Sequence, residues 1–318
     1  MRRALLALAT AGLLALTGCG SDTDPAPAEP APTDAPPATP PQVAGLAVYE
    51  SRYDVVETSM RVQDGLRQAG MVVAVVDHAA NASSVGQELR PTTLVIGGAP
   101  PAGTPIMQEQ QRAAVDLPQK FLTWQAEDGT TYLAHNSAEY VAARAGIPAD
   151  SPALDVLRTA AARISAAASG TDRPLSAGAD VSVVTGDGYL VEQTSDASVP
   201  QSIARYQQAF TDRGLMAVAT VDHAKGATSI GEQLRPTQVT FVGNPMVGTT
   251  LLQASQTIGI DLPVRYLAWE DEAGTVHLAH PDIRVLAERH SVTGTDETLD
   301  MIEMATARLT GTAAGAGG

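Results

Sequence analysis

Apolar and small side chains recur along residues 55–66 at spacings of four, three and four positions. This spacing places them on one face of an amphipathic helix. Asp54, followed three residues later by Glu57, resembles a capping box, in which two side chains bond backbone N–H groups of the first helical turn. We therefore expect a helix that begins just after Asp54 and packs one face against a core.

Runs of β-branched and apolar residues predict the strands that follow. Residues 72–76 are typical of a short buried strand, and another strand is expected near Leu94. The segment of small residues between them is expected to be a helix that ends at Arg90, because the residue before Pro91 disfavours helical backbone. A Gly/Pro-rich loop and a further helix come next. Residues 121–135 then form two apolar runs around Asp-Gly, which is typical of a β-hairpin.

The same pattern occurs twice in the chain. One constant offset carries Asp77-His-Ala onto Asp222-His-Ala, and about half the positions of residues 72–135 are identical in the second copy. Such ungapped identity indicates the duplication of a whole domain. We therefore expect two homologous α+β domains, residues 45–168 and 179–313, which form an intramolecular pseudo-dimer. Each is expected to have its own core and a mixed β-sheet with helices packed mainly on one face.

The N-terminal segment predicts export and lipid attachment. Residues 1–18 combine two arginines with a short apolar run and are interpreted as a lipoprotein signal peptide. The Leu-Thr-Gly-Cys sequence that ends at Cys19 resembles the bacterial lipobox, in which the cysteine is acylated and becomes the first mature residue. Residues 19–44 are rich in proline and are expected to be an extended tether. The alternative is an ordinary secretory signal with a chance cysteine.

The lipobox interpretation implies an extracytoplasmic protein that is lipid-anchored to the cell membrane. Cys19 is the single cysteine of the chain, so no intramolecular disulfide can form, and lipidation would consume the free thiol. The formal net charge of −15 disfavours nucleic acid as a partner, because the chain carries no basic patch that would release counterions.

Several short motifs occur in both copies in the same order. They are Asp-His-Ala, Leu-Arg-Pro-Thr, Gly-Thr, Asp-Leu-Pro, a tryptophan and a closing hairpin, and the second copy adds Gly-Asn-Pro at residues 243–245. This run resembles the family called domain of unknown function 302, over nearly the whole of both copies. The resemblance implies a compact α+β domain, sometimes in tandem, and brings no established activity. The first copy departs from it with Gly-Ala-Pro at residues 98–100, so a role that needs the asparagine side chain is expected in the second copy.

The Asp-His pairs are the first candidates for chemistry. Asp77-His78 and Asp222-His223 stand where a predicted strand meets a helix, a place where side chains often face a cleft. A histidine there would serve as general acid or base, with the aspartate as its support. The alternative is structural: the aspartate caps the following helix and the histidine bonds a backbone group.

A transition-metal site is a second hypothesis, although the sequence predicts no cofactor firmly. It requires the strand that ends at His135 or His280 to neighbour the strand that ends at an Asp-His pair, which would gather two imidazoles and a carboxylate in each copy. The candidate metal ligands are His78, His135, His223 and His280. Two further histidines, His277 and His290, lack counterparts in the first copy and are expected on the surface.

The loop after the third predicted strand is the candidate ligand-binding segment of the second copy. Gly243, Asn244, Gly248 and Thr249 precede or begin a helix and would present backbone N–H groups to an anion. Turn formation explains the same residues equally well. Arg235 is either a ligand clamp or, as we expect for it and for its counterpart in the first copy, one half of a salt bridge with the aspartate of the Asp-Leu-Pro motif.

Three functions are consistent with these residues. The first is a non-catalytic envelope module that binds a small ligand or an envelope protein. The second is an enzyme that uses His78 and His223 with Asp77 and Asp222. The third is a metal-binding envelope protein. No Ser-His-Asp or Cys-His set with recognisable flanking motifs occurs in the chain, which favours the first.

Overall fold

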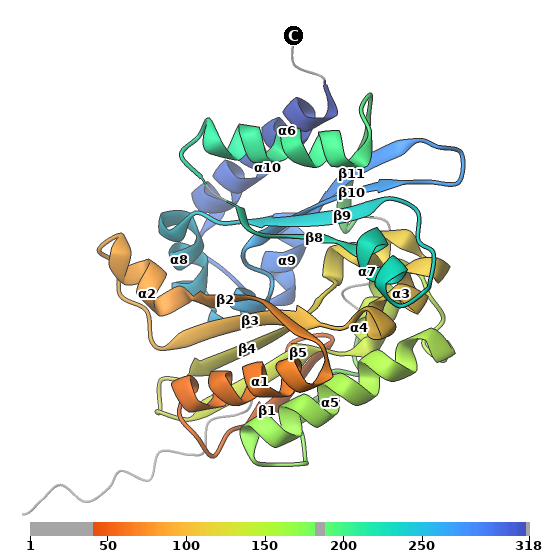
Figure 1. Ribbon diagram of the computed structural model, residues 1–318. Coiled ribbons are helices and arrows are strands. Elements are labelled where there is room, and N and C mark those ends of the chain that lie inside the picture. Colours follow the sequence, from red (N-terminus) through yellow and green to blue (C-terminus); the bar gives the residue numbers. More distant parts are fainter. Residues whose placement is uncertain (1–40, 182–187, 216, 316–318) are drawn as a thin grey trace, which may run out of the picture. The chain divides into compact units, whose positions relative to one another are not determined.

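The computed structural model describes residues 41–181, 188–215 and 217–315 (Figure 1). The predicted signal peptide, Cys19 and most of the predicted tether lie outside these residues. The described residues fall within one compact unit, which contains both repeats.

The first repeat contains a six-stranded sheet with the order β2-β3-β4-β5-β1-β6. Its strands are β1 (Leu46–Glu50), β2 (Met71–Asp77), β3 (Thr92–Gly98), β4 (Gln119–Gln125), β5 (Thr131–Asn136) and the short β6 (Ser176–Ala177). Its helices are α1 (Val55–Ala69), α2 (His78–Ser84), α3 (Pro100–Glu109), η1 (Gln111–Asp116), α4 (Ala138–Ala145), η2 (Pro152–Leu154) and α5 (Asp155–Ser169), where η marks a 3₁₀ helix.

The second repeat contains a five-stranded sheet with the matching order β7-β11-β10-β9-β8. Its strands are β7 (Leu190–Ser195), β8 (Ala217–Asp222), β9 (Thr237–Val242), β10 (Val264–Glu270) and β11 (Val276–Pro281). Its helices are α6 (Val199–Thr211), α7 (His223–Ser229), α8 (Pro245–Ala254), η3 (Gln256–Ile260), α9 (Ile283–Arg289) and α10 (Asp296–Ala314).

This arrangement confirms the α+β class and the duplication. All strand pairs among the described residues are antiparallel, whereas the element order suggested a mixed sheet. The reason is the path of α1, which joins two strands that run in the same direction. Three strands, β3, β4 and β5, lie between β1 and β2, so the parallel strands are never neighbours.

The strands β1 and β7, which open each repeat, were not predicted. Residues 46–50 alternate poorly between apolar and polar positions, because four of the five are buried. A strand enclosed on both faces loses the period-two signal by which a strand is predicted. β1 pairs over five positions with β5, the second strand of the hairpin, and so extends the sheet on that side.

One face of each sheet is covered by a pair of helices. α1 packs along α5 over the first sheet, and α6 packs against α10 over the second (Figure 1). Separate apolar clusters fill these two layers, one around Val62 and Phe121 and the other around Tyr206 and Tyr266. For these four helices, the prediction that helices pack mainly on one face of each sheet is confirmed.

The other faces contribute to a core that the two repeats share. The largest apolar cluster contains Leu94 and Leu122 of the first repeat together with Val239 and Leu267 of the second, all fully buried. The short helix η1 packs on β9 and β10 of the second repeat, and η3 packs on β3 and β4 of the first. The sequence suggested one core per repeat. The structure instead joins the repeats through a common core, because each sheet has a second apolar face to bury.

Candidate functional site

The Asp-His pairs take the structural role that was the alternative interpretation. The Asp77 carboxylate accepts a hydrogen bond from the Ala80 N–H at 2.8 Å and caps α2. In the second repeat the Asp222 carboxylate accepts from the Lys225 N–H at 2.9 Å and caps α7. An N-cap of this kind satisfies a backbone donor that the helix leaves free.

The neighbouring histidines lie in the contact between the repeats. His78 Nε2 is 3.3 Å from the carbonyl oxygen of Gly259, in η3 of the opposite repeat. His223 lies beside Ala114 and Leu117 of the first repeat in the corresponding way. Burial lowers the pKa of both histidines to about 4, so both rings are neutral at physiological pH. Their surroundings make them packing residues of the joint between the repeats.

The four candidate metal ligands are not brought together. Strands β3 and β4 lie between β2, which leads to His78, and β5, which carries His135, and the corresponding strands separate His223 from His280. His135 Nδ1 is instead 2.8 Å from Ser165 Oγ, and His280 Nδ1 is 3.1 Å from its neighbouring backbone carbonyl. Within the described ranges no group of three or more His, Cys, Asp or Glu side chains is placed to hold a metal ion. The neighbourhood of strands that the metal-site hypothesis requires therefore does not occur.

The predicted salt bridges of Arg90 and Arg235 are also wrong. Arg90 donates to Gln256 Oε1 at 2.9 Å, and Arg235 donates to Gln111 Oε1 at 3.1 Å. Each arginine thus bonds a glutamine of the opposite repeat. Because Arg235 is held in this contact, it is not part of the pocket described below.

The aspartates of the two Asp-Leu-Pro motifs form a buried ionic cluster where the repeats meet. Arg265 donates to Asp116 at 3.0 Å and to Asp261 at 2.9 Å. Lys120, which occupies in the first repeat the position of Arg265, has its Nζ 3.9 Å from Asp116 and 3.6 Å from Asp261. Asp116, Asp261, Lys120 and Arg265 are each at most 2 % exposed. Corresponding residues of the two copies therefore pair with one another.

Two further residues attach to Asp261 alone. Arg289 donates to its Oδ2 at 2.8 Å, and His290 Nε2 lies 2.9 Å from the same oxygen. His290 was expected on the surface, which is wrong, because α9 ends beside the cluster and buries it. Although burial alone would raise it, the guanidinium groups of Arg289 and Arg265 hold the pKa of Asp261 well below its usual range.

Lys120 is the unusual member of the cluster. Burial and the adjacent Arg265 guanidinium lower its pKa to about 7. A lysine with such a pKa suits general-base chemistry. Its side chain, however, is 2 % exposed and lies inside the joint between the repeats, where substrate has no access. The cluster therefore serves the pairing of the repeats.

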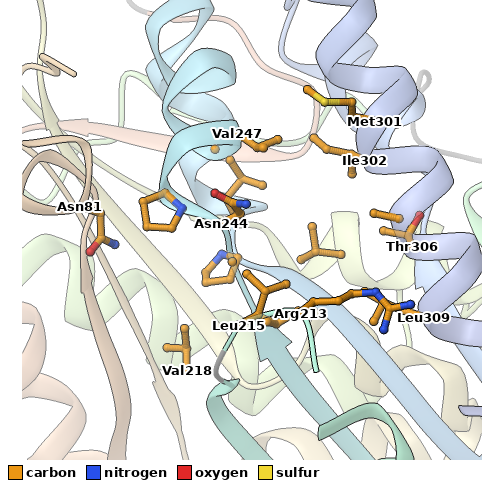
Figure 2. Close-up of a pocket in the computed structure, with 18 of the residues that line it drawn as sticks. Asn81, Arg213, Leu215, Val218, Asn244, Val247, Met301, Ile302, Thr306 and Leu309 are labelled. Atoms are coloured by element: carbon orange, nitrogen blue, oxygen red, sulfur yellow. The ribbon is translucent and has the colours of Figure 1, made fainter. Parts of the chain in front are cut away.

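A pocket of about 690 Å³ lies mainly in the second repeat. Helices α8 and α10 line it, together with the ends of β8, β9 and β10, and α2 of the first repeat adds His78 and Asn81. Figure 2 shows Val247 of α8 and Asn244, which precedes this helix, on one side of the pocket, and Met301, Ile302, Thr306 and Leu309 along α10. Pockets of about 300–1,000 Å³ are typical sites for small organic ligands.

Four of the predicted ligand-binding residues line this pocket: Gly243, Asn244, Gly248 and Thr249. The Asn244 side chain caps α8 by accepting from the Met246 N–H at 3.0 Å. Thr249 Oγ1 donates to the Pro245 carbonyl at 2.7 Å. The polar atoms of the loop thus shape the start of α8, and the pocket beside it is lined mostly by Val, Leu, Ile, Met and Pro side chains.

Sequence reasoning missed the part of the pocket that α10 supplies. Met301 and Met304 line it, and each is about half exposed, at 51 % and 53 %. The corresponding residues of the first repeat, Val156 and Thr159, do not line it. The comparison of the copies does show a change of residue type here, because two methionines stand where the first copy has a valine and a threonine.

Comparison with known proteins identifies the repeats. The model of the family described as "Domain of unknown function DUF302" matches residues 47–168 and 191–309. The chain belongs to the DUF302 family. A solved DUF302 structure, an uncharacterized conserved protein from Bacillus stearothermophilus, aligns over 40 % of this chain and 99 % of its own, with 16 % identity and a TM-score of 0.37.

Among curated proteins, this DUF302 chain is similar to proteins named fluoride-specific ion channel FluC. It is 43 % identical over 106 residues to FluC 1 of Brucella suis, which is 33 % of this chain and 42 % of that protein. FluC 1 of Brucella abortus has the same identity, over 39 % of its length. The chain therefore spans about two fifths of these relatives. In the part of this chain that the structure describes, no helix is long and apolar enough to cross a membrane.

Proposed function

We propose that this DUF302 chain is a non-catalytic binding protein of the cell envelope, held by a lipid on Cys19, whose second repeat takes up a small and largely apolar ligand. The observation that carries the proposal is the pocket of about 690 Å³ between α8 and α10. Apolar side chains surround it, and the helix cap at Asn244 gives its wall a fixed polar edge.

The absence of a reactive constellation at this pocket supports binding over catalysis. Its titratable lining residues are His78, Arg213, Tyr266 and Arg308. Burial keeps His78 neutral by lowering its pKa to about 4 and raises the pKa of Tyr266. General acid–base chemistry needs a group with a pKa near the working pH, beside the reacting atoms, and neither of these two groups meets that requirement.

The lipobox-like Leu-Thr-Gly-Cys sequence and the proline-rich tether support the location. Acylation of Cys19 would retain the repeats at the membrane surface, and an extended tether would let them reach ligands there. Mass spectrometry of the N-terminal peptide from membrane-extracted protein is expected to show an acylated Cys19. An unmodified mature N-terminus elsewhere would contradict the anchor and leave the binding proposal standing.

The binding proposal is tested with the mature chain that lacks only Cys19, so that no detergent competes for the pocket. N-phenyl-1-naphthylamine, a neutral apolar dye that fluoresces when it leaves water, is expected to bind at one site per chain. Ala305→Trp places an indole at the pocket wall and is expected to weaken binding at least about tenfold, equivalent to about 1.4 kcal/mol.

The matched control is Ala160→Trp, which changes the corresponding residue of α5 outside the pocket. It is expected to leave dye binding unchanged. Failure of the parent chain to bind the dye, or equal weakening by both substitutions, would refute the pocket as a binding site.

A further inference from the structure

We infer that the ligand is a single-chain amphiphile with one acidic group, whose apolar chain fills the pocket and whose acid pairs with Arg213 and Arg308. This inference rests on the proposed function and specifies its ligand. The first observation that supports it is the charge of the residues that line the pocket. The chain has 35 aspartates and glutamates against 20 lysines and arginines, yet among the described residues no carboxylate lines the pocket, and the charged lining residues there are Arg213 and Arg308.

The two arginines are available to a ligand. Arg213 bonds only the backbone carbonyl of Ala209, at 3.0 Å, among the described contacts, and neither Arg213 nor Arg308 has a carboxylate within 4.0 Å in the described part of the chain. Other arginines of the same repeat are paired. Arg205 bonds Asp196, and Arg284 bonds Asp300 and Glu303.

An unpaired guanidinium beside an apolar wall favours a ligand acid. Guanidinium groups match carboxylate and phosphate oxygens with two parallel hydrogen bonds. Both arginines are exposed side chains at the pocket, so an acidic headgroup can reach them from solvent. In Figure 2 Arg213 extends in the direction of Leu309, the neighbour of Arg308 on α10.

The rest of the lining favours an alkyl chain. Met301 and Ile302 of α10 and Leu215, which precedes β8, contribute flexible or branched aliphatic side chains. Methionine adapts its shape to irregular apolar partners. An inorganic anion alone would leave this apolar surface exposed to water, whereas an amphiphile covers it and gains about 25 cal/mol for each Å² that it buries.

The test uses displacement of N-phenyl-1-naphthylamine from the mature chain that lacks Cys19. Decanoate, decyl phosphate, decan-1-ol and decyltrimethylammonium are compared below their micelle concentrations at pH 7.5 and low salt. We expect decanoate or decyl phosphate to bind at least tenfold more tightly than decan-1-ol, and the cationic amphiphile to bind most weakly. The ratio between decanoate and decyl phosphate identifies the preferred acid.

The variants assign the effect to the two arginines. Arg213→Gln with Arg308→Gln is expected to remove the preference for the acids and to leave decan-1-ol binding within twofold. Arg163→Gln is the matched control, because Arg163 occupies on α5 the place of Arg308 on α10 and is also exposed. It removes one positive charge outside the pocket, as each of the two pocket substitutions does inside it, and is expected to keep the preference.

The outcomes separate the two proposals. Equal binding of decanoate and decan-1-ol, or an acid preference that survives the double substitution, overturns the amphiphile assignment while the apolar pocket stands. A bound dye that none of the four compounds displaces also overturns the amphiphile assignment, whereas failure of the dye itself to bind overturns the proposed function.

Discussion

The two repeats share their strand order but differ where the first long helix of each repeat returns to the sheet. In the first repeat, a Cβ atom at Gly70 would overlap the carbonyl oxygen of Gly98 and lie 2.6 Å from Ala99 Cβ. At Gly214, which ends the same turn in the second repeat, a Cβ atom would meet nothing within 4 Å. The first repeat is therefore closed at this point, and the second has space there.

A neighbouring position shows the same difference. A Cβ atom at Gly97 would lie 2.5 Å from the Met71 carbonyl oxygen and 2.8 Å from a Leu66 methyl group. The corresponding residue of the second repeat is Val242, whose side chain is buried and lines the pocket. A helix can approach a strand closely at glycine and must stand away from valine. Small changes of side-chain volume thus distinguish a closed repeat from one that holds a pocket.

The joint between the repeats, by contrast, uses corresponding residues on both sides. α2 packs on α8 as α7 packs on α3, and Arg90 bonds Gln256 as Arg235 bonds Gln111. The surfaces through which the two repeats contact each other have kept corresponding contacts. The side of the second repeat that α6 and α10 cover differs from that of the first. This division is consistent with a constant joint and a binding role for one repeat.

The largest expected effect concerns the unequal partners of the two buried aspartates in the joint. Asp261 bonds two arginines and His290, whereas Asp116 bonds one arginine and Tyr189. Removal of one partner from a buried ion pair costs about 3–5 kcal/mol, because it leaves an unpaired buried charge. We expect Asp261→Asn to lower the free energy of unfolding in urea by about this amount, and Asp116→Asn to lower it less.

Asp300→Asn, at an exposed ion pair, is the control and is expected to cost less than about 1 kcal/mol. Equal losses for the two buried aspartates would show that the additional partners of Asp261 contribute nothing.

The second prediction tests whether close packing at Gly97 keeps the first repeat closed. Gly97→Val introduces there the residue that the second repeat carries, against the close backbone and leucine contacts of Gly97. Overpacking of this kind costs about 1–3 kcal/mol, and we expect a value near the upper end. Thermal and urea unfolding measure it.

Gly98→Ala is the control, since the nearest atom to its added Cβ, Pro118 Cβ, is at 3.6 Å, an ordinary contact distance. A loss for Gly97→Val no larger than that of Gly98→Ala would mean that close packing at Gly97 does not keep the first repeat closed.

The third prediction concerns the pair Lys120 and Arg265, which occupy one position in the two repeats. The pKa of Lys120 is about 7 in the folded chain and about 10.4 in an unfolded chain. Between these pH values the unfolded state binds more protons, so this lysine makes the free energy of unfolding rise with pH, by up to about 1.4 kcal/mol per pH unit. Arg265 stays charged and adds no such slope, because the adjacent carboxylates outweigh burial and raise its pKa.

Urea unfolding between pH 7 and pH 9.5 compares the parent chain with Lys120→Met. We expect the substitution to remove the slope, whereas Lys225→Met, at an exposed lysine, should retain it. Identical slopes in all three proteins would show that Lys120 is not held in a perturbed environment.

Local patterns were sufficient where one segment carries its own signal. The capping residue Asp54, the strand at residues 72–76 and the hairpin at residues 121–135 all occur as expected. The strand β1 was missed because burial on both faces removes its periodicity. Arg90 and His290 were misplaced because their partners, Gln256 and Asp261, are distant along the chain.

The residues of the candidate site fall into the same two groups, those that a local motif predicts and those that become neighbours only in the folded chain. The loop with Asn244 was found because its glycines and the asparagine form a motif, and it lines the pocket. Arg213 and Met301 carry no motif of their own. Met301 becomes a neighbour of that loop only when α10 packs over the second sheet, and Arg213 only when the turn between α6 and β8 lies beside the pocket.

By itself, the sequence determined the duplication, the α+β class and most of the elements, because these depend on side-chain periodicity, on turn and cap residues and on identity at a constant offset. Only the tertiary structure decided that the two repeats share a core, that the Asp-His pairs serve their joint, and that a pocket opens in one repeat beside two arginines that have no carboxylate partner among the described residues. These features depend on which distant surfaces meet and on how closely a helix approaches a sheet. The volume of a single side chain, such as Val242 in place of Gly97, changes that approach without changing any local pattern.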